Sequence, residues 1–154
     1  MCNGRIMIAG TNSGCGKTTV VCGLLKCLLN RKMNIHAFKC GPDYIDTSFH
    51  KKVLKIPTGN LDSWFCKPED LRKIVSKKAD KCDIAVIEGV MGYYDGMGFT
   101  QRASAYEIAD ITSTPVILII NCKGMSSSLE AVLSGFVNMK QNSHIKGVIF
   151  NRLS

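Results

Sequence analysis

Gly10-Thr11-Asn12-Ser13-Gly14-Cys15-Gly16-Lys17-Thr18-Thr19 is the stretch that decides the fold of this chain. It follows an apolar run over residues 6–9 and opens an amphipathic segment over residues 20–29, which indicates a strand, a glycine loop and a helix in that order. Glycines in such a loop let backbone N–H groups point inward, the helix N-terminus adds partial positive charge, and Lys17 adds a full charge. Thr18 would place its hydroxyl on Mg²⁺. The stretch therefore predicts a site for a phosphate chain.

This loop is a variant of the usual phosphate-loop pattern. The strict pattern has glycine where this chain has Thr11, and Gly10 stands one residue earlier. A glycine-rich turn that only caps a helix would explain Gly14 and Gly16, but it would not explain a lysine and two threonines at the start of an apolar helix. We interpret the loop as nucleotide-binding, with these candidate contacts: Thr11, Asn12, Ser13, Gly14, Cys15, Gly16, Lys17, Thr18 and Thr19.

Length and composition favour one soluble domain. A chain of 154 residues with 45% hydrophobic content can bury a core of ordinary size. No signal-like segment is evident, and no apolar run approaches the roughly 20 residues that a membrane span needs, so we expect a cytoplasmic protein without membrane contact. The eight cysteines form no C-x-x-C pair, which favours thiols over a disulfide framework or a zinc site.

The charge balance favours anionic partners. Lysine and arginine number 20 against 12 aspartate and glutamate, giving a formal net charge of +8. Much of the excess is spaced as on solvated helix faces and lacks interleaved aromatic residues, so no nucleic-acid partner is expected. The excess positive charge would attract ATP and a polycarboxylate substrate equally.

Apolar runs alternate with helical patterns along the chain. Strands are predicted over residues 5–9, 35–38, 84–87, 116–120 and 147–150, several of them apolar at nearly every position, as in parallel strands covered on both faces. Helices are predicted over residues 17–30, 68–78, 103–112 and 126–140, with a shorter one over 47–54. This alternation indicates an α/β fold: a doubly wound, mainly parallel sheet with helices on both faces, as in P-loop NTPases. Ligands of such sheets bind beyond the carboxyl ends of the strands.

The segment after the second predicted strand carries two carboxylates behind a Gly41-Pro42 turn. Asp43 is nearer the strand end, so we favour it as a metal-side carboxylate. Asp46 could equally cap the helix predicted from residue 47 or take part in the site. Lys39, at the strand end itself, could reach a phosphate or a reacting carboxylate.

The third predicted strand ends in Glu88, followed by a glycine-rich segment that contains Asp95. A carboxylate at the end of a buried apolar strand, followed by glycine, suits Mg²⁺ coordination or water positioning beside a nucleotide. If Glu88 instead pairs with Lys17 or Lys39, it still lies in the site. Asp95 could be a turn residue or a substrate contact.

The last two predicted strands are each followed by polar residues. Ser126 would cap the following helix. Asn151 and Arg152 come after the fifth strand, where the asparagine amide could pair with the edge of a nucleotide base.

Five motifs follow one another along the chain. They are Gly10-Thr11-x-Ser13-Gly14-x-Gly16-Lys17-Thr18-Thr19, Lys39-x-Gly41-Pro42-Asp43-Tyr44-Ile45-Asp46, Asn60-Leu61-Asp62, Glu88-Gly89-Val90-Met91-Gly92-x-x-Asp95-Gly96 and Gly147-Val148-Ile149-x-Asn151-Arg152. Together they closely resemble the cobyrinic acid a,c-diamide synthase family. The resemblance covers residues 1–154 and only the N-terminal synthetase domain of that family. Its members continue into a glutaminase domain, so we expect a C-terminally truncated chain.

The resemblance implies ATP-dependent amidation of the a and c acetate groups of a tetrapyrrole polycarboxylate. ATP would convert the carboxylate into an acyl phosphate, which ammonia from glutamine then attacks; catalysis is chiefly positioning and charge neutralisation. The implied catalytic residues are Lys17, Lys39, Asp43, Glu88 and Asp95. Those implied for Mg²⁺ are Thr18, Asp43 and Glu88, and those implied for the substrate are Tyr44, Asp46 and Asp95. Asn151 resembles the adenine-reading asparagine of related synthetases, with Arg152 beside it.

Two alternatives accompany this resemblance. A similar enzyme family amidates nickel-sirohydrochlorin on the same scaffold, and a non-catalytic piece could bind ATP without turnover. The family usually has aspartate where this chain has Asn121, and often arginine where it has Ser127. Domains of the family commonly pair, so a homodimer is a further expectation.

Overall fold

The computed structural model describes residues 4–42, 44–98 and 100–153, apart from the side chains of residues 44–46. Within these residues the strands are β1 (Gly4–Gly10), β2 (Ile35–Cys40), β3 (Thr58–Leu61), β4 (Ile84–Glu88), β5 (Val116–Asn121) and β6 (Ile145–Asn151). The helices are α1 (Lys17–Asn30), α2 (Tyr44–Lys52), α3 (Pro68–Ala79), α4 (Ala105–Thr112) and α5 (Ser128–Asn138). None of the described helices is both long and apolar enough to cross a lipid bilayer.

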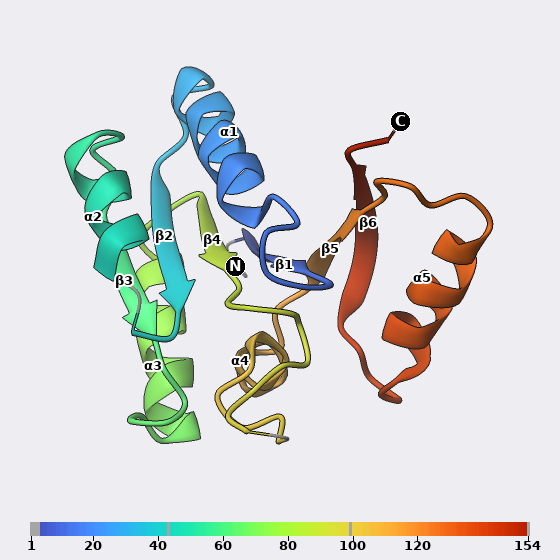
Figure 1. The fold of residues 1–154 in the computed structure, drawn as a ribbon. Helices are drawn as coiled ribbons and strands as arrows, with labels where there is room; N and C mark the ends of the chain where they lie inside the picture. The colour runs from blue at the N-terminus through green and yellow to red at the C-terminus, as the bar shows by residue number, and fades with distance from the viewer. Residues whose placement is uncertain (1–3, 43, 99, 154) are drawn as a thin grey trace.

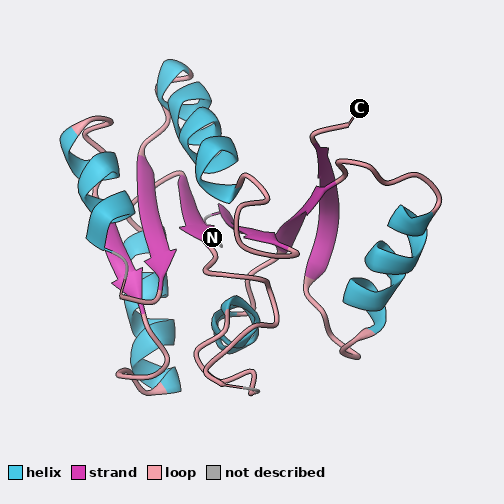
Figure 2. Cartoon of the chain, viewed as in Figure 1, coloured by secondary structure: helices cyan, strands magenta, loops and turns pink. Residues whose placement is uncertain are grey.

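The strands form one parallel sheet in the order β3-β2-β4-β1-β5-β6 (Figures 1 and 2). From β1 the chain runs outward to β2 and β3, returns to β4 beside β1, and then continues on the other side through β5 and β6. The order therefore reverses at β1, where ligands of open α/β sheets bind beyond the strand ends. The predicted α/β class with a parallel sheet is confirmed.

Helices cover both faces of the sheet because successive strand residues point to opposite faces. Met7 packs in the core layer beneath α3 and α4, whereas its neighbour Ile8 packs in the layer beneath α1. Both side chains are almost completely buried. This double coverage is why the strands read as nearly continuous apolar runs.

The helices follow from local sequence signals. In α1 the buried residues Val21, Leu25 and Leu28 recur at the spacing of one helical face. In α3 the first turn holds Pro68 together with two acidic residues, and the last turn holds two lysines, which complements the helix dipole. In α4 the Ser104 hydroxyl accepts a hydrogen bond from the Glu107 backbone N–H at 3.1 Å and so caps the helix.

The structure differs from the predicted elements in several places. β3 was not predicted, because Thr58-Gly59-Asn60-Leu61 is short and mostly polar, with only its first and last residues buried. At the other edge, β6 begins two residues before the predicted strand. The helix α4 begins at Ala105 rather than at residue 103.

The predicted Ser126 cap is wrong, and of the two interpretations of Asp46 the structure does not support the helix cap. The helix α2 begins at Tyr44, directly behind the Gly41-Pro42 turn, so Asp46 lies inside its first turn and does not precede it. The helix α5 begins at Ser128, and its N-cap position is Ser127 rather than Ser126, without a side-chain hydrogen bond to the helix. In both cases the backbone enters the helix at a different residue from the one that the polar run suggests.

Candidate functional site

The carboxyl ends of the three central strands bring together the glycine loop after β1, Lys39 on β2 and Glu88 on β4. Ile8 of β1 and Lys39 of β2 both lie in register with Glu88, one on each side. The strand register therefore places a cation and a carboxylate beside the start of the glycine loop. Asp43, the other predicted metal-side carboxylate, lies outside the described residues.

Glycines shape the phosphate loop in two different ways. Gly14 and Gly16 have φ angles of 74° and 104°, in the left-handed region that favours glycine. Gly10 does not need such an angle; it leaves space, because a Cβ there would clash with the Cys15 sulfur. Cys15 is fully buried in the core under α1. The displaced glycine of the sequence pattern thus makes room for an inward-facing thiol.

Lys17 lies at the first position of α1 and is 8% exposed. Its ammonium group donates hydrogen bonds to the carbonyl oxygens of Asn12, at 3.0 Å, and Met91, at 2.6 Å. Burial lowers the pKa of Lys17, because the charged form loses solvation. No described carboxylate forms an ion pair with this ammonium group. Its charge is therefore held by neutral acceptors, which suits an anionic ligand.

Glu88 is completely buried and joins two further site residues. Its Oε1 atom accepts a hydrogen bond from the Thr18 hydroxyl at 2.7 Å and from the Lys39 ammonium at 2.9 Å. Its Oε2 atom has no hydrogen-bond partner among the described residues. A buried carboxylate oxygen without a partner is costly unless a ligand satisfies it.

The pair of Thr18 and Glu88 fits a magnesium ion. Mg²⁺ prefers oxygen ligands and usually takes only one or two protein carboxylates, with the remaining positions filled by water and phosphate. The threonine hydroxyl and the carboxylate are in contact, and the open Oε2 atom would be available as a further ligand. These residues, predicted separately from sequence, are therefore brought together.

A hollow of about 270 Å³ opens over the start of α1, lined by Gly14, Gly16, Lys17, Thr18, Thr19 and Arg152. Asn151, at the end of β6, donates a hydrogen bond from its amide nitrogen to the Cys15 carbonyl at 2.9 Å. Its amide oxygen accepts from the Arg152 backbone N–H at 3.0 Å. The asparagine thus braces the phosphate loop, and its contact with a base stays a prediction.

The segment between β4 and α4 contacts the phosphate loop. The Tyr93 backbone N–H donates to the Gly10 carbonyl at 2.8 Å, and the Met91 carbonyl accepts from Lys17. The phenol groups of Tyr93 and Tyr94 donate to the carbonyls of Ser143 and Phe136, both at 2.8 Å. These anchors were not predicted, because backbone acceptors leave no mark in a sequence and the tyrosines resembled ordinary core residues.

Asp95 projects from this segment as an exposed residue. Its Oδ2 atom accepts a hydrogen bond from the Gly92 backbone N–H at 3.0 Å, so one oxygen closes a turn. It also lines a hollow of about 300 Å³ that includes Thr100, Gln101 and Met139. Both predicted interpretations of Asp95, as turn residue and as ligand contact, are thus compatible with its position. Tyr44 and Asp46 lie at the start of α2, beyond the carboxyl end of β2.

Three other groups near the site are held in their neutral form. Burial raises the pKa of the Cys40 thiol, at the end of β2, to about 12. Burial likewise raises the pKa of Tyr94 to about 12, and it raises the pKa of Tyr93 further. The Cys40 thiol and these two phenols are therefore uncharged at neutral pH, and the charged side chains of the site are lysines, an arginine and carboxylates.

The glycine at position 16 offers a first test of the loop. Gly16→Ala should destabilise the protein by about 1–2 kcal/mol. Alanine is strained in the left-handed backbone conformation of this position, and its Cβ would clash with the Asn151 amide. Nucleotide affinity should fall as the loop shifts. Gly23→Ala, within α1 and with nothing near the added Cβ, should instead stabilise by about 0.5–1 kcal/mol. Urea denaturation and nucleotide titration of both variants measure this; equal effects would refute the strained-loop account.

The fold and the glycine loop define a P-loop nucleotide-binding domain. More particularly, the chain belongs to the family described as CobQ/CobB/MinD/ParA nucleotide binding domain, whose family model matches residues 6–154.

The chain is similar to two curated relatives and to one solved structure. It is 42% identical over 154 residues to a cobyrinate a,c-diamide synthase of Priestia megaterium, covering 99% of this chain and 34% of the relative. It is 44% identical over 151 residues to a cobyrinate a,c-diamide synthase of Limosilactobacillus reuteri, covering 97% and 33%. The chain thus spans about a third of the length of these relatives. A crystal structure of FlhF complexed with GTP/Mg(2+) shares the fold, with a TM-score of 0.67, 14% identity, and coverage of 97% of this chain and 56% of that one.

Proposed function

We propose that this domain binds Mg²⁺–ATP and phosphorylates a carboxylate of cobyrinic acid, as the synthetase part of a cobyrinate a,c-diamide synthase. The observation that carries the proposal is the cluster at the end of β4, where buried Glu88 contacts both Thr18 and Lys39 and keeps one oxygen open. The similarity to cobyrinate a,c-diamide synthases over nearly the whole chain supports the choice of substrate.

Different groups of the site bind the phosphates and the magnesium ion. Backbone N–H groups of the glycine loop and the N-terminus of α1 face the phosphates, and Lys17 adds a full positive charge. Thr18 and Glu88 hold Mg²⁺, which would neutralise phosphate charge when bound. Lys39, held 2.9 Å from Glu88, is placed at the same edge to meet the transferring phosphate or the substrate carboxylate.

Phosphoryl transfer solves the problem that a carboxylate has a poor leaving group. A substrate carboxylate oxygen attacks the γ-phosphorus of ATP, the bond to the β-phosphate oxygen breaks, and ADP leaves. Ammonia then attacks the carbonyl carbon of the acyl phosphate, and inorganic phosphate leaves with the bonding electrons as the amide forms. We assign the supply of ammonia to glutamine, hydrolysed by a separate domain. Positioning and charge neutralisation by the site drive the first step.

The proposal is tested with the full-length protein that carries this chain. ATP, Mg²⁺ and ammonium are supplied with either cobyrinic acid or nickel-sirohydrochlorin, and ADP and amide products are quantified by mass spectrometry. We expect cobyrinic acid to stimulate ADP formation with matching amide formation. Stimulation by nickel-sirohydrochlorin alone would reassign the substrate, and stimulation by neither would leave a nucleotide-binding module.

A substitution of Asp95 should impair use of the substrate without changing nucleotide binding. Asp95→Ala should leave ATP affinity unchanged and lower kcat/KM for the tetrapyrrole about tenfold or more, the usual effect of losing one hydrogen bond to a charged group. Asp95→Asn is the control, because its amide oxygen can still accept from the Gly92 N–H. If Asp95→Ala amidates as fast as the wild type, the substrate role of Asp95 is wrong.

A further inference from the structure

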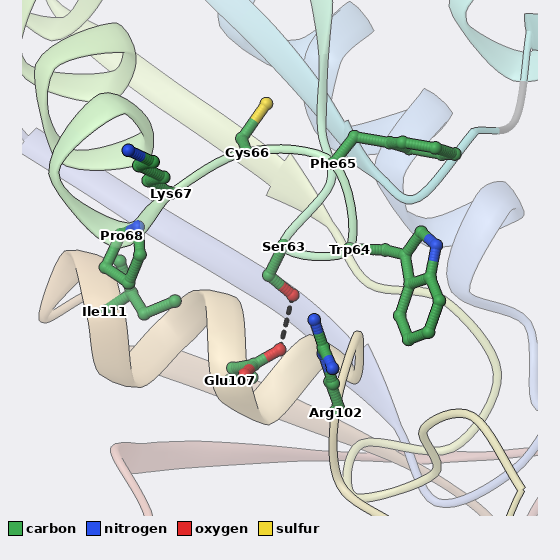
Figure 3. Close-up of a pocket in the computed structure, with 9 residues that line it drawn as sticks. All are labelled: Ser63, Trp64, Phe65, Cys66, Lys67, Pro68, Arg102, Glu107 and Ile111. Atoms are coloured by element: carbon green, nitrogen blue, oxygen red, sulfur yellow. Dashed lines mark hydrogen bonds between the residues drawn. The ribbon is translucent and has the colours of Figure 1, made fainter.

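A second hollow, of about 320 Å³, lies between the β3–α3 connection and the helix α4 (Figure 3). Its walls come from residues 63–68 on one side and from Arg102, Glu107 and Ile111 on the other. Both walls follow carboxyl ends of strands, β3 in one case and β4 in the other. The hollow is therefore on the same edge of the sheet as the phosphate loop, but none of its lining residues takes part in the nucleotide site.

A stacked arginine dominates one side of this hollow. The Arg102 guanidinium carbon lies 4.4 Å from the centre of the Trp64 ring. Stacking of this kind orients a guanidinium group without using its N–H donors, which remain able to bind a carboxylate in a bidentate manner. No described carboxylate forms an ion pair with Arg102. In Figure 3 its nitrogen atoms point into the space beside Ser63 and Glu107.

Glu107, the one acidic residue in this wall, is already engaged. Its carboxylate accepts hydrogen bonds from the Ser63 hydroxyl and from the Ala103 backbone N–H, the latter at 2.7 Å. The Ser63 bond ties α4 to the β3–α3 connection, and the two donors together partly neutralise the carboxylate. Lys67, exposed on the opposite wall, adds a second cation to the rim. The basic groups therefore remain available to an anion.

Two exposed aromatic side chains form the apolar part of the lining of this hollow. Trp64 is 44% exposed and Phe65 is 77% exposed, although large aromatic side chains are usually well buried. Figure 3 shows the Trp64 ring beside Arg102 and the Phe65 ring extending away from the Ser63–Glu107 pair on the same side of the view. Aromatic faces beside an unpaired guanidinium group suit a ligand with a broad apolar body and carboxylates at its rim.

We propose that this hollow, which we call the Trp64–Arg102 pocket, binds a peripheral carboxylate of the tetrapyrrole that is not being amidated. Arg102 binds the carboxylate, Lys67 adds charge, and Trp64 and Phe65 contact the apolar edge of the macrocycle. This inference rests on the proposed function, and it assigns the part of the site that orients the substrate.

The location of the pocket agrees with a ligand of that size. β3 is three strand positions from β1, which is about 14 Å at the usual strand spacing. A macrocycle with acidic arms on its rim can reach from the phosphate loop to such a distance, whereas a small anion cannot. One connection, residues 89–104, also carries Met91 at the phosphate loop, Asp95 and Arg102, and so links the two ends.

The test measures the dissociation constant of cobyrinic acid by equilibrium dialysis, read from corrin absorbance, with the full-length protein and without ATP. Arg102→Gln should weaken binding about tenfold, as expected for one lost charge-assisted contact. Lys77→Gln, which removes the same charge from an exposed position at the far end of α3, should bind as the wild type does. ATP affinity should be equal in all three proteins.

A second probe separates carboxylate recognition from general packing. The fully esterified form of cobyrinic acid should bind the wild type and Arg102→Gln with the same affinity, because it has no carboxylate for Arg102. An equal loss for ester and acid would overturn the assignment, as would equal binding of the acid by Arg102→Gln and Lys77→Gln. If the wild type binds no cobyrinic acid, the proposed function fails and this inference fails with it; the other outcomes leave the proposed function intact.

Discussion

Replacing Lys17 with alanine should abolish measurable ATP-dependent amidation, with a fall of about 10³-fold or more, comparable to the loss of a preorganised electrostatic contact. Lys17 is 8% exposed, and its ammonium group is held by the Asn12 and Met91 carbonyls rather than by a carboxylate. The variant loses the only full positive charge that lines the phosphate hollow from within α1. Because this charge meets the phosphates in both ground and transition states, nucleotide affinity and turnover should both fall.

The matched control is Lys26→Ala, which removes the same group from an exposed position on the same helix. Titration with ATP and Mg²⁺, followed by calorimetry, gives the affinity of each protein, and product formation gives the turnover. Lys26→Ala should behave as the wild type in both measurements. A Lys17→Ala protein that still bound Mg²⁺–ATP with unchanged affinity would falsify the assignment of the phosphate loop.

How much of this site the sequence predicts depends on the kind of contact. Lys39 and Glu88 could be placed at one edge because each ends an apolar run, and parallel strands bring such ends together. The Met91 carbonyl and the Asn151 brace could not, since they depend on the path of the backbone and on contacts between residues 74 and 136 positions apart. The Trp64–Arg102 stack is a contact of the same kind.

Local sequence patterns also fail to predict the structure at positions where tertiary packing determines it. The segment 58–61 pairs with β2 although its composition is polar, because its backbone completes the sheet edge and its two end residues are buried. The Cys15 thiol illustrates the reverse case: a residue within a polar loop turns into the core and explains why glycine stands at position 10. Propensity yields to tertiary contacts in both cases.

Glu88→Gln is expected to cause the largest loss of stability in this site, about 3–5 kcal/mol. Glu88 is completely buried, and the Lys39 side chain is 6% exposed. Glutamine keeps the size of the side chain and an acceptor for Thr18, but it removes the negative charge that contacts the buried Lys39 ammonium. Urea denaturation of the two proteins measures the change in the free energy of unfolding.

A pair of equal length whose carboxylate is exposed is the control. His144 and Asp110 also lie 2.9 Å apart, but the Asp110 side chain is 53% exposed. Asp110→Asn should therefore cost less than about 1 kcal/mol, because water already solvates the exposed Asp110 carboxylate and weakens its interaction with His144. A loss as large as that of Glu88→Gln would show that burial does not set the strength of these pairs.

A double-mutant cycle and a metal titration complete the argument on Glu88. The loss in Glu88→Gln combined with Lys39→Met should be smaller than the sum of the two single losses by about 0.5–3 kcal/mol, because each change removes one side of the same ion pair. Mg²⁺ should strengthen ATP binding in the wild type and have little effect in Glu88→Gln, since the variant lacks the open carboxylate oxygen. Full coupling with unchanged Mg²⁺ dependence would make Glu88 a purely structural partner of Lys39 and would move the metal site elsewhere.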